Sequence, residues 1–344
     1  MWQESPISIS VVMPTYNTPV SFLQEATESI LNQTFRDFEF IIIDDGSTNE
    51  SVAYLLGLTD PRIRLIRNES NLGITRSLNI GFQSARGKYV ARMDSDDVAL
   101  PARLEKQFLF MEAHPDVIAC GTRTVAYGKP PYVRKVPPES REDYRIRALF
   151  ANPGPAHATA FFDRNKLVQH HISYDEKLIY AQDYGMWTSI IQYGQVVKLP
   201  EVLLYHRSHP DQISKSHRKK QIECDKITQE KLLRALLGEV SKEDIDLHYL
   251  FSTGYYRNLK FEKTVLDWYR RLIDANNRKG IYDKKRFKRY IYRVIIPRAA
   301  LRSSDASMGY LQRILYLFRV LPFLLALQIA LWAVGKKILS VCGR

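Results

Sequence analysis

Residues 38–47 read FEFIIIDDGS, and residues 88–97 read KYVARMDSDD. In both stretches an apolar run typical of a buried strand ends in a cluster of carboxylates. Ligands of an open parallel sheet bind beyond the carboxyl ends of its strands, so both clusters are expected at one ligand-binding edge. Carboxylates gathered there repel one another unless a divalent cation, which prefers oxygen ligands, neutralises them. The two stretches therefore predict a parallel sheet with a site for a metal ion and a diphosphate.

The surrounding sequence alternates between apolar runs and segments of helical period. Strands are predicted at 7–13, 38–44, 63–67, 88–93 and 117–120, and helices near 21–32, 49–57, 74–85 and 102–113. This alternation is typical of right-handed βαβ units, so we expect an α/β fold with a doubly wound, mainly parallel sheet. Residues 121–215 are less regular and contain several prolines, which predicts loops and short strands that wall a pocket.

The length and charge of the chain indicate a catalytic domain with a basic appendage. A chain of 344 residues is long for one core. With 50 Lys and Arg residues against 37 Asp and Glu residues, the formal net charge is +13, which favours nucleic acid, an anionic membrane or a phosphorylated substrate as partner. We expect a catalytic domain at residues 1–215, with a nucleotide-binding half to about 120 and an acceptor half after it, and a helical C-terminal region at 216–344.

The C-terminal region joins a basic stretch to an apolar tail. Many cations lie between Arg257 and Arg302, and residues 310–341 are strongly apolar. The uncharged run from Val320 to Val334 is shorter than the ~20 residues of a spanning helix and contains Pro322. We interpret the region as attached to an anionic membrane surface. A helical-bundle core and a true span are the alternatives. No recognition motif accompanies the charge, so nucleic acid is not the expected partner.

The cysteines and the N-terminus favour an intracellular location. Cys120, Cys224 and Cys342 lie far apart and show neither metal-ligand spacing nor a disulfide framework, which fits a reducing compartment. The first apolar run has no basic region before it and is too short to span a membrane, so we interpret it as a strand of a protein that is not exported. The cytoplasmic face of the plasma membrane is the expected location.

The first predicted strand is followed by the sequence PTYN. Pro14 is expected to end the hydrogen-bonded ladder, which displays Thr15 and Tyr16 at the sheet edge beside Asn17. Tyr16 can stack on a nucleobase, since every base offers a π-face, or it can simply pack.

Asp44 and Asp45 end the second predicted strand. A carboxylate at this place can accept the imide N–H of uracil, a hydrogen that cytosine lacks. The alternative role is an N-cap for the helix that follows. We favour Asp45 as the residue that reads the base.

Asp94 and Asp96 form an Asp-x-Asp pair around Ser95. Alternate side chains of an extended segment share a face, so both carboxylates can point to one site. One can bind Mg²⁺ or Mn²⁺ while the other orients a ribose hydroxyl or a water molecule on the metal. Surface turns often show this pair, but its position after an apolar strand, with a matching cluster upstream, favours the metal site.

Seven short motifs accompany these residues. They are residues 12–17 (VMPTYN), 29–35 (SILNQTF), 43–47 (IDDGS), 71–73 (NLG), 85–89 (ARGKY), 94–97 (DSDD) and 100–104 (LPARL). In combination they resemble glycosyltransferase family 2, the inverting enzymes with the GT-A nucleotide-sugar-binding fold, of the bacterial surface-polysaccharide type. The resemblance covers about the first 215 residues and does not extend into the tail.

The resemblance implies a hexosyl- or N-acetylhexosaminyl-transferase. Such an enzyme would move a sugar from a UDP-sugar to a hydroxyl of a lipid-linked or other glycan acceptor, with Mn²⁺ or Mg²⁺ as cofactor. The Gln-x-x-Arg-Trp signature of processive polymerases is absent, which favours one sugar per acceptor.

The resemblance also implies roles for single residues. Thr15 and Asp45 would line the nucleoside site, Arg76 would lie near the donor diphosphate, and Asp94 and Asp96 would hold donor and metal. The rest of the predicted donor-binding set is Pro14, Tyr16, Asn17, Asp44 and Ser95.

The general base of the family lies in a Glu-Asp pair at a helix start. Residues 182–187 (QDYGMW) fit this place. Gln182 stands where the family has Glu, so Asp183 is the predicted base, and what the Glu contributes to acceptor binding or to tuning its neighbour stays open. A helix N-cap is the alternative role of Asp183.

Residues 205–214 (YHRSHPDQIS) resemble a family segment that folds over the diphosphate. Arg207 can pair with phosphate oxygens, and His209 can donate to them or join Asp96 in the metal shell. A structural role is the alternative for His209. Residues 152–159, including His157, are expected to face the acceptor.

Two other functions compete with a transferase. A nucleotidyltransferase making activated sugars usually opens with a glycine-rich basic loop, and residues 13–18 contain no glycine. A non-catalytic membrane-associated scaffold would leave Asp94, Asp96 and Asp183 without a purpose. Release of UDP from UDP-sugars distinguishes a transferase from both.

Overall fold

The structure is a computed structural model that describes residues 7–133, 139–208, 217–253 and 261–295. Contacts divide the chain into two compact units. The first comprises Met1–Tyr144 and Asn152–Asp225, and the second comprises Arg145–Ala151 and Lys226–Arg344. The predicted domain boundary at residue 215 lies outside the described residues and stays a prediction.

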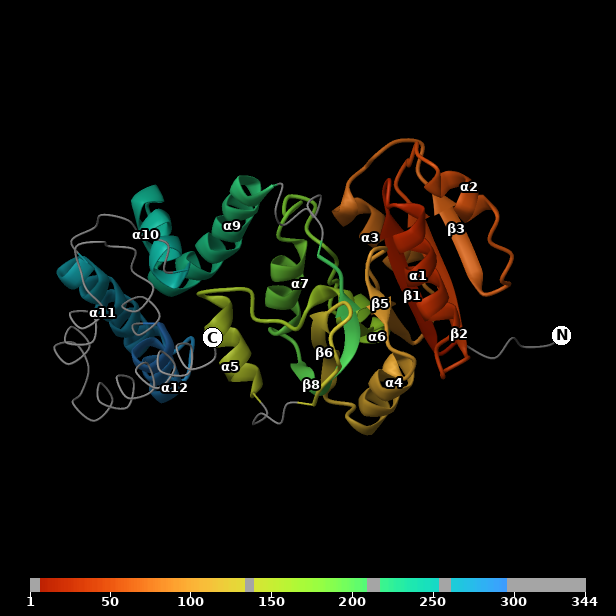
Figure 1. Ribbon diagram of the computed structural model, residues 1–344. Coiled ribbons are helices and arrows are strands. Elements are labelled where there is room, and N and C mark those ends of the chain that lie inside the picture. Colours follow the sequence, from red (N-terminus) through yellow and green to blue (C-terminus); the bar gives the residue numbers. More distant parts are fainter. Residues whose placement is uncertain (1–6, 134–138, 209–216, 254–260, 296–344) are drawn as a thin grey trace, which may run out of the picture. The chain divides into compact units, whose positions relative to one another are not determined.

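An eight-stranded sheet forms the centre of the first unit, in the order β3-β2-β1-β4-β7-β6-β8-β5 (Figure 1). The strands are β1 Ile9–Thr15, β2 Phe38–Asp44, β3 Ile63–Arg67, β4 Tyr89–Arg92, β5 Val98–Ala99, β6 Val117–Ala126, β7 Phe161–Asp163 and β8 Gln195–His206. Strands β1 to β4 are parallel, β6 is parallel to β8, and β5 and β7 are antiparallel to their neighbours. The predicted α/β fold with a mainly parallel sheet is confirmed.

Helices connect the strands as the sequence predicts. The first unit contains α1 Val20–Leu31, α2 Ser51–Leu56, α3 Ile74–Ser84, α4 Arg103–Ala113, the start of α5 Arg141–Ala148, η1 His157–Thr159, α6 Arg164–Gln169, α7 Gln182–Ile190 and the start of α9 Arg218–Leu237. Up to residue 120, every predicted element is present within two residues of its predicted bounds, apart from β6, which continues to Ala126.

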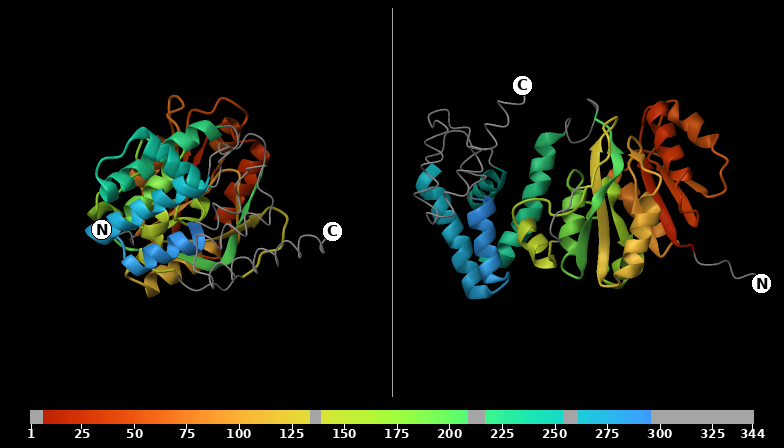
Figure 2. Two further views of the ribbon diagram at one scale, coloured as in Figure 1. Left: turned by 90° about the vertical axis from the view of Figure 1, so that its left-hand side faces the viewer. Right: turned by 60° about the horizontal axis from the view of Figure 1, so that its bottom comes forward.

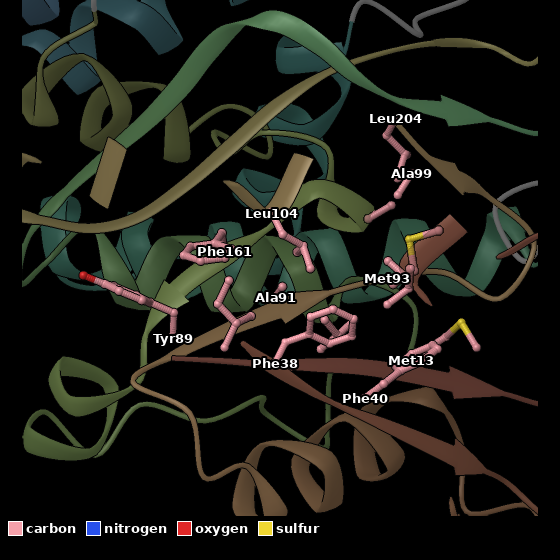
Figure 3. Close-up of a cluster of buried hydrophobic side chains, with 14 of the residues drawn as sticks. Met13, Phe38, Phe40, Tyr89, Ala91, Met93, Ala99, Leu104, Phe161 and Leu204 are labelled. Atoms are coloured by element: carbon pink, nitrogen blue, oxygen red, sulfur yellow. The ribbon is translucent and has the colours of Figure 1, made fainter. Parts of the chain in front are cut away.

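One face of the sheet packs against α1 and α4. Alternate residues of a strand point to the same face, so Ile9, Val11 and Met13 of β1 lie on one side. They share a buried cluster with Leu23 of α1 and Leu104 of α4. Figure 3 shows this core with Met13, Phe38, Phe40, Tyr89, Ala91, Met93, Ala99, Leu104, Phe161 and Leu204 labelled. This packing holds the carboxyl ends of β1, β2 and β4 together.

Helix α3 covers the opposite face. Gly81 of α3 lies directly on β1, where a Cβ atom would come within 2.4 Å of Val12 Cγ1. A side chain at residue 81 would therefore push the helix away from the sheet.

The region from residue 121 onward is more regular than predicted. Strands β6 and β8 run side by side as a long parallel pair (Figure 2). Register shifts around Gly121 and Arg123 leave Lys198 and Val202 as consecutive paired positions of β8. The irregularity accommodates Pro200, which cannot donate to a ladder. That proline obscured β8 in the sequence.

The second unit is helical, as expected for the C-terminal region. It contains the end of α5, most of α9, α10 Lys242–Thr253, α11 Phe261–Lys279, α12 Lys284–Tyr290 and the short η2 Ile291–Ile295. His248 lies in its core, accepts a hydrogen bond from Trp268 Nε1 (3.2 Å) and contacts the carbonyl oxygen of Leu149 (2.7 Å). Burial lowers the pKa of His248 to about 4, so the imidazole is neutral and its role is structural.

The apolar tail lies outside the described residues. In the part of the chain that the structure describes, no helix is both long enough and apolar enough to span a bilayer.

Candidate active site

Three loops meet beyond the carboxyl ends of β1, β2 and β4. Asn17 N donates to Ser47 Oγ and Asn17 Oδ1 accepts from Thr48 N, both at 2.9 Å. Thr18 Oγ1 and Ser95 Oγ share a hydrogen bond of 2.7 Å. The segments that the sequence singled out at three strand ends therefore form one connected site.

Pro14 does not end the ladder as predicted. Strand β1 continues to Thr15, which pairs with Asp44 of β2. The pairing of β1 with β4 ends at Val12, whose carbonyl accepts from Met93 N. Pro14 has its nitrogen on that same side, where no ladder partner remains, so its missing N–H leaves no gap in the sheet. Pro14 and Thr15 are buried, and Tyr16 beyond them is 48% exposed.

Asp44 and Asp45 are buried, and both accept hydrogen bonds from groups of the protein itself. Asp44 accepts from Ser47 N (2.9 Å) and from Arg67 Nε (2.8 Å). Neither aspartate caps α2, whose N-cap is Glu50.

Asp45 holds the loop after β3 against the loop after β2. Its carboxylate accepts from Asn68 Nδ2 (2.7 Å), Leu72 N (2.9 Å) and Gly73 N (2.8 Å). Gly46 has a φ of 73°, and a Cβ there would lie 2.6 Å from the Ser70 carbonyl carbon, so the approach of the two loops requires glycine. Reading of a base by Asp45 stays a prediction.

The loop after β4 gathers three carboxylates. Oxygen atoms of Asp94, Asp96 and Asp97 lie within 4.8 Å of one another. Asp97, which is 1% exposed, was not among the predicted site residues, although it adjoins the Asp-x-Asp pair. An all-oxygen group of this size fits a hard divalent cation. Burial, reinforced by the neighbouring carboxylates and opposed by Arg92, raises the pKa of the Asp94 carboxyl to about 6.

Two buried arginines lie beside these carboxylates. Arg92, 3% exposed, forms an ion pair with Asp94, and its Nε has no hydrogen-bond partner among the described residues. Arg103 Nη2 donates to the carbonyl oxygen of Arg92 (2.5 Å), and Arg103 Nε donates to Gln107 (3.1 Å). Burial and the charge of Arg92 lower the pKa of Arg103 to about 10. The positive charges of Arg92 and Arg103 partly neutralise the negative charges of the carboxylates at residues 94–97.

Arg207 ties β8 to the acidic loop. Its guanidinium lies over the rings of Phe22 (4.3 Å) and Tyr127 (4.1 Å) and pairs with Glu25 at 2.9 Å. Its Nε donates to the carbonyl oxygen of Asp96 (2.9 Å), and its backbone N–H donates to Asp97 (3.0 Å). Contact of Arg207 with phosphate stays a prediction.

His206 is a neighbour of the acidic loop that the prediction missed. Its Nδ1 lies 3.2 Å from Asp97, and this hydrogen bond raises the pKa of His206. His209, the predicted metal ligand, lies outside the described residues. The same His-Arg-Ser-His segment carried the signal for a histidine beside the carboxylates.

Asp183 lies in the first turn of α7. It is not the N-cap, a position held by Ala181. Its two oxygens accept from Tyr184 N (2.8 Å) and Asn152 Nδ2 (2.7 Å). Burial raises the pKa of Asp183. Asn152, from the segment predicted to face the acceptor, thus reaches the predicted base.

His157 of that segment has a buried partner. Its Nε2 lies 2.7 Å from the hydroxyl of Tyr174. Burial, with a smaller effect of Arg92, lowers the pKa of His157, and burial raises the pKa of Tyr174. Arg76 of α3 pairs with Glu176 (2.9 Å), and both side chains are more than half exposed.

Known proteins resemble this chain in sequence. Residues 10–170 match the family described as Glycosyl transferase family 2. The amylovoran biosynthesis glycosyltransferase AmsE of Erwinia amylovora is 33% identical over 221 residues, which are 60% of this chain and 78% of AmsE. An uncharacterized glycosyltransferase of Haemophilus influenzae is 31% identical over 63% of this chain and 71% of its own length. The chain belongs to glycosyl transferase family 2. It is therefore a glycosyltransferase.

Another relative is covered less completely. An uncharacterized glycosyltransferase of Methanocaldococcus jannaschii is 38% identical over 53% of this chain and 64% of its own length. Among solved structures, Staphylococcus aureus TarS 1–349 in complex with UDP-GlcNAc superposes with a TM-score of 0.57 at 19% identity, over 86% of this chain and 85% of TarS 1–349. At this identity the likeness shows a shared fold, the GT-A fold of the family 2 prediction.

Proposed function

We propose that this family 2 glycosyltransferase moves one sugar from a UDP-sugar to a hydroxyl of a glycan acceptor during polysaccharide synthesis, with inversion at the anomeric carbon. The observation that carries the proposal is the site itself. A loop of clustered carboxylates, suited to a cation and a diphosphate, lies at the strand ends. In the same unit Asp183 is partly buried, and both of its oxygens accept hydrogen bonds. The fold shared with TarS in complex with UDP-GlcNAc, and the likeness to AmsE, support the donor and the pathway.

The donor would lie against the loops at the strand ends. Tyr16 is exposed there and offers a ring for the base. Asp94, Asp96 and Asp97 would hold Mn²⁺ or Mg²⁺, which supplies positive charge for the diphosphate. Arg207 positions this loop through the Asp96 carbonyl.

Asp183 would remove the proton of the acceptor hydroxyl. Burial raises its pKa and so makes the ionised carboxylate a stronger base. Asn152 and the Tyr184 N–H hold it in one orientation. As the hydroxyl oxygen attacks the anomeric carbon, the bond to the diphosphate breaks on the opposite side. This single displacement inverts the configuration and needs no covalent nucleophile on the protein.

A donor panel tests the proposal. The protein is incubated with UDP-glucose, UDP-galactose, UDP-GlcNAc and UDP-GalNAc, with and without a membrane lipid extract, and the released UDP and the glycolipid products are measured. We expect one UDP-sugar to release UDP faster when the extract is present. Consumption of none of them would contradict the proposal, and formation of UDP-sugar from UTP and a sugar phosphate would identify a nucleotidyltransferase.

The metal prediction follows from the loop at 94–97. Activity is expected to vanish in EDTA and to return with Mn²⁺ or Mg²⁺, because the carboxylates need a cation before they can approach a diphosphate. Asp96→Ala should weaken UDP binding, measured by calorimetry, only when metal is present. Asp116→Asn, which alters an exposed aspartate outside the site, is the control. Full activity in chelator would contradict the prediction.

We further propose a lipid-linked acceptor, reached at the cytoplasmic face of the plasma membrane. Helix α12 and the turn after it expose a group of cations that suits an anionic surface, namely Lys284, Lys285, Arg286, Lys288, Arg289 and Arg293. They adjoin in sequence the apolar tail from residue 310 onward. The two together would provide the pair of attachment signals that stable peripheral binding needs.

Vesicle sedimentation tests the attachment. The full chain is expected to sediment with vesicles rich in phosphatidylglycerol and not with neutral ones, and high salt should release part of it, because salt screens the cations. Replacing Lys284, Lys285 and Lys288 by Gln should weaken binding without changing the melting temperature, since all three are exposed. Deletion of residues 305–344 should abolish binding. Equal sedimentation with neutral and anionic vesicles, or unfolding of the deletion variant, would contradict the proposal.

A further inference from the structure

The start of α9 packs on the segment that leads into α7. His217 stacks on Tyr180 with ring centres 4.9 Å apart, and Lys220 Nζ lies 5.6 Å from the centre of the same ring. One turn further along, Cys224 is buried in a cluster with Tyr184. Lys220 and Cys224 are one turn apart on α9, and His217 directly precedes the helix, so the first turns of α9 lie against residues 178–184.

Asp225 follows Cys224, which shares a buried cluster with Tyr184, the residue next to Asp183. It is partly buried, and the charges that act on it are Asp183 of α7 and Arg218, two turns earlier on α9. Burial, reinforced by Asp183, raises the pKa of Asp225 to about 7. Among the described residues nothing donates a hydrogen bond to its carboxylate, whereas both oxygens of Asp183 accept one. The predicted base therefore has a second carboxylate beside it whose acceptor capacity is unused.

Two neighbouring carboxylates repel each other, and burial adds to the cost of ionising both. A ligand with hydroxyl groups relieves this cost, because each O–H donates to an oxygen that otherwise faces a like charge. Asp183 is the carboxylate that α7 contributes. The neighbouring Gln182 is neutral and adds no second one. The second carboxylate comes from α9, a helix that the family motifs do not include.

We propose that Asp225 binds the acceptor by accepting a hydrogen bond from a hydroxyl adjacent to the one that Asp183 deprotonates. The inference rests on the proposed transferase function and specifies its acceptor side. A hydrogen bond of this kind favours acceptors with neighbouring hydroxyls, such as a sugar or a polyol, over a simple alcohol. The proton of the reacting hydroxyl passes to Asp183, and Asp225 forms and breaks no covalent bond.

Acceptor kinetics test the role of Asp225. With a membrane lipid extract as acceptor, Asp225→Asn is expected to raise the acceptor KM about 10-fold, because the amide oxygen of Asn still accepts a hydrogen bond but carries no charge. The KM for UDP-sugar should stay unchanged. Glu223→Gln removes an exposed carboxylate from the same helix and should match the wild type. Periodate cleaves vicinal diols, which here include the reacting hydroxyl, so treatment of the extract should abolish transfer by the wild type and by Asp225→Asn. An unchanged acceptor KM in Asp225→Asn would overturn the proposal.

Melting temperatures test the carboxylate pair without any substrate. The native state binds the Asp225 proton more tightly than the unfolded chain, so ionisation of Asp225 lowers stability as pH rises toward 7. Asp225→Asn escapes this loss, and its melting temperature should gain a few °C on the wild type between pH 5 and pH 8. Glu223→Gln should gain nothing, and the gain should shrink in an Asp183→Asn background. An equal gain in melting temperature in the Asp183→Asn background would contradict an interaction between Asp183 and Asp225.

The two experiments separate the inference from the proposed function. A wild-type protein that consumes no UDP-sugar contradicts the transferase, while the melting series still decides whether Asp183 and Asp225 interact. An active wild type whose Asp225→Asn variant has the original acceptor KM contradicts the inference alone.

Discussion

Asp183→Asn is expected to reduce sugar transfer at least ~100-fold while UDP-sugar binding stays close to that of the wild type. The substitution keeps the size of the side chain and an oxygen that can accept from Tyr184 N. It removes the lone pair that takes the acceptor proton. The measurement is kcat for transfer alongside calorimetric binding of the donor. Asp116→Asn serves as the control, because it changes an exposed aspartate in the same unit.

The pH profile of transfer provides a second test of Asp183. Because burial raises its pKa, the carboxyl gains a proton at a higher pH than an ordinary aspartate does. Transfer should therefore fall as the pH drops through this raised pKa, and the residual activity of Asp183→Asn should lack that limb. Wild-type transfer by Asp183→Asn would show that another group is the base.

The nucleotide-binding half was predictable because its signals are local. In β1 and β2, strand positions alternate between the two faces of the sheet, and apolar residues fill both faces. Acidic and glycine residues then mark the turn after β2. The loops at 14–18, 44–48 and 94–97 follow strands that are adjacent in the sheet, so the topology of parallel strands alone brings them together.

Other parts of the site depend on partners far away in sequence. The contact of Asp183 with Asn152 joins residues whose spacing gives no periodic signal. Asp97 faces His206 of β8, a strand whose pattern is interrupted by Pro200. Pro14 was expected to end β1, and this failed because the effect of a proline depends on whether a partner strand lies on its nitrogen side.

The roles of buried polar residues also escaped prediction. Asp45 serves three donors of the loop at 68–73, and Arg207 supports the Asp96 carbonyl. A sequence motif shows that these residues adjoin the site. It does not distinguish a side chain that contacts the ligand from one that shapes the loop beside it, because both roles need the same residue type at the same place.

Arg92→Met is expected to lower the free energy of unfolding by about 3–5 kcal/mol, the range for removing one partner of a buried ion pair. Arg92 is 3% exposed and is the cation paired with Asp94. Without it, Asp94, whose side chain is 30% exposed, keeps only the repulsion of its two acidic neighbours. Urea denaturation in EDTA, which excludes compensation by a bound cation, measures the change. Lys88→Met is the control, because Lys88 is 49% exposed and its partner Glu112 is 40% exposed, so no buried charge is left unpaired.

The double variant Arg92→Met/Asp94→Asn isolates the charge from the packing. It removes the uncompensated carboxylate along with the arginine, so it should be more stable than Arg92→Met alone, by the portion of the loss that is electrostatic. The deficit of Arg92→Met should also shrink from pH 8 to pH 5. Its Asp94 pKa rises further once the arginine is gone, so acid neutralises the carboxyl in the folded state and removes the penalty. A deficit that is the same at both pH values, and in the double variant, would show that Arg92 acts through packing alone.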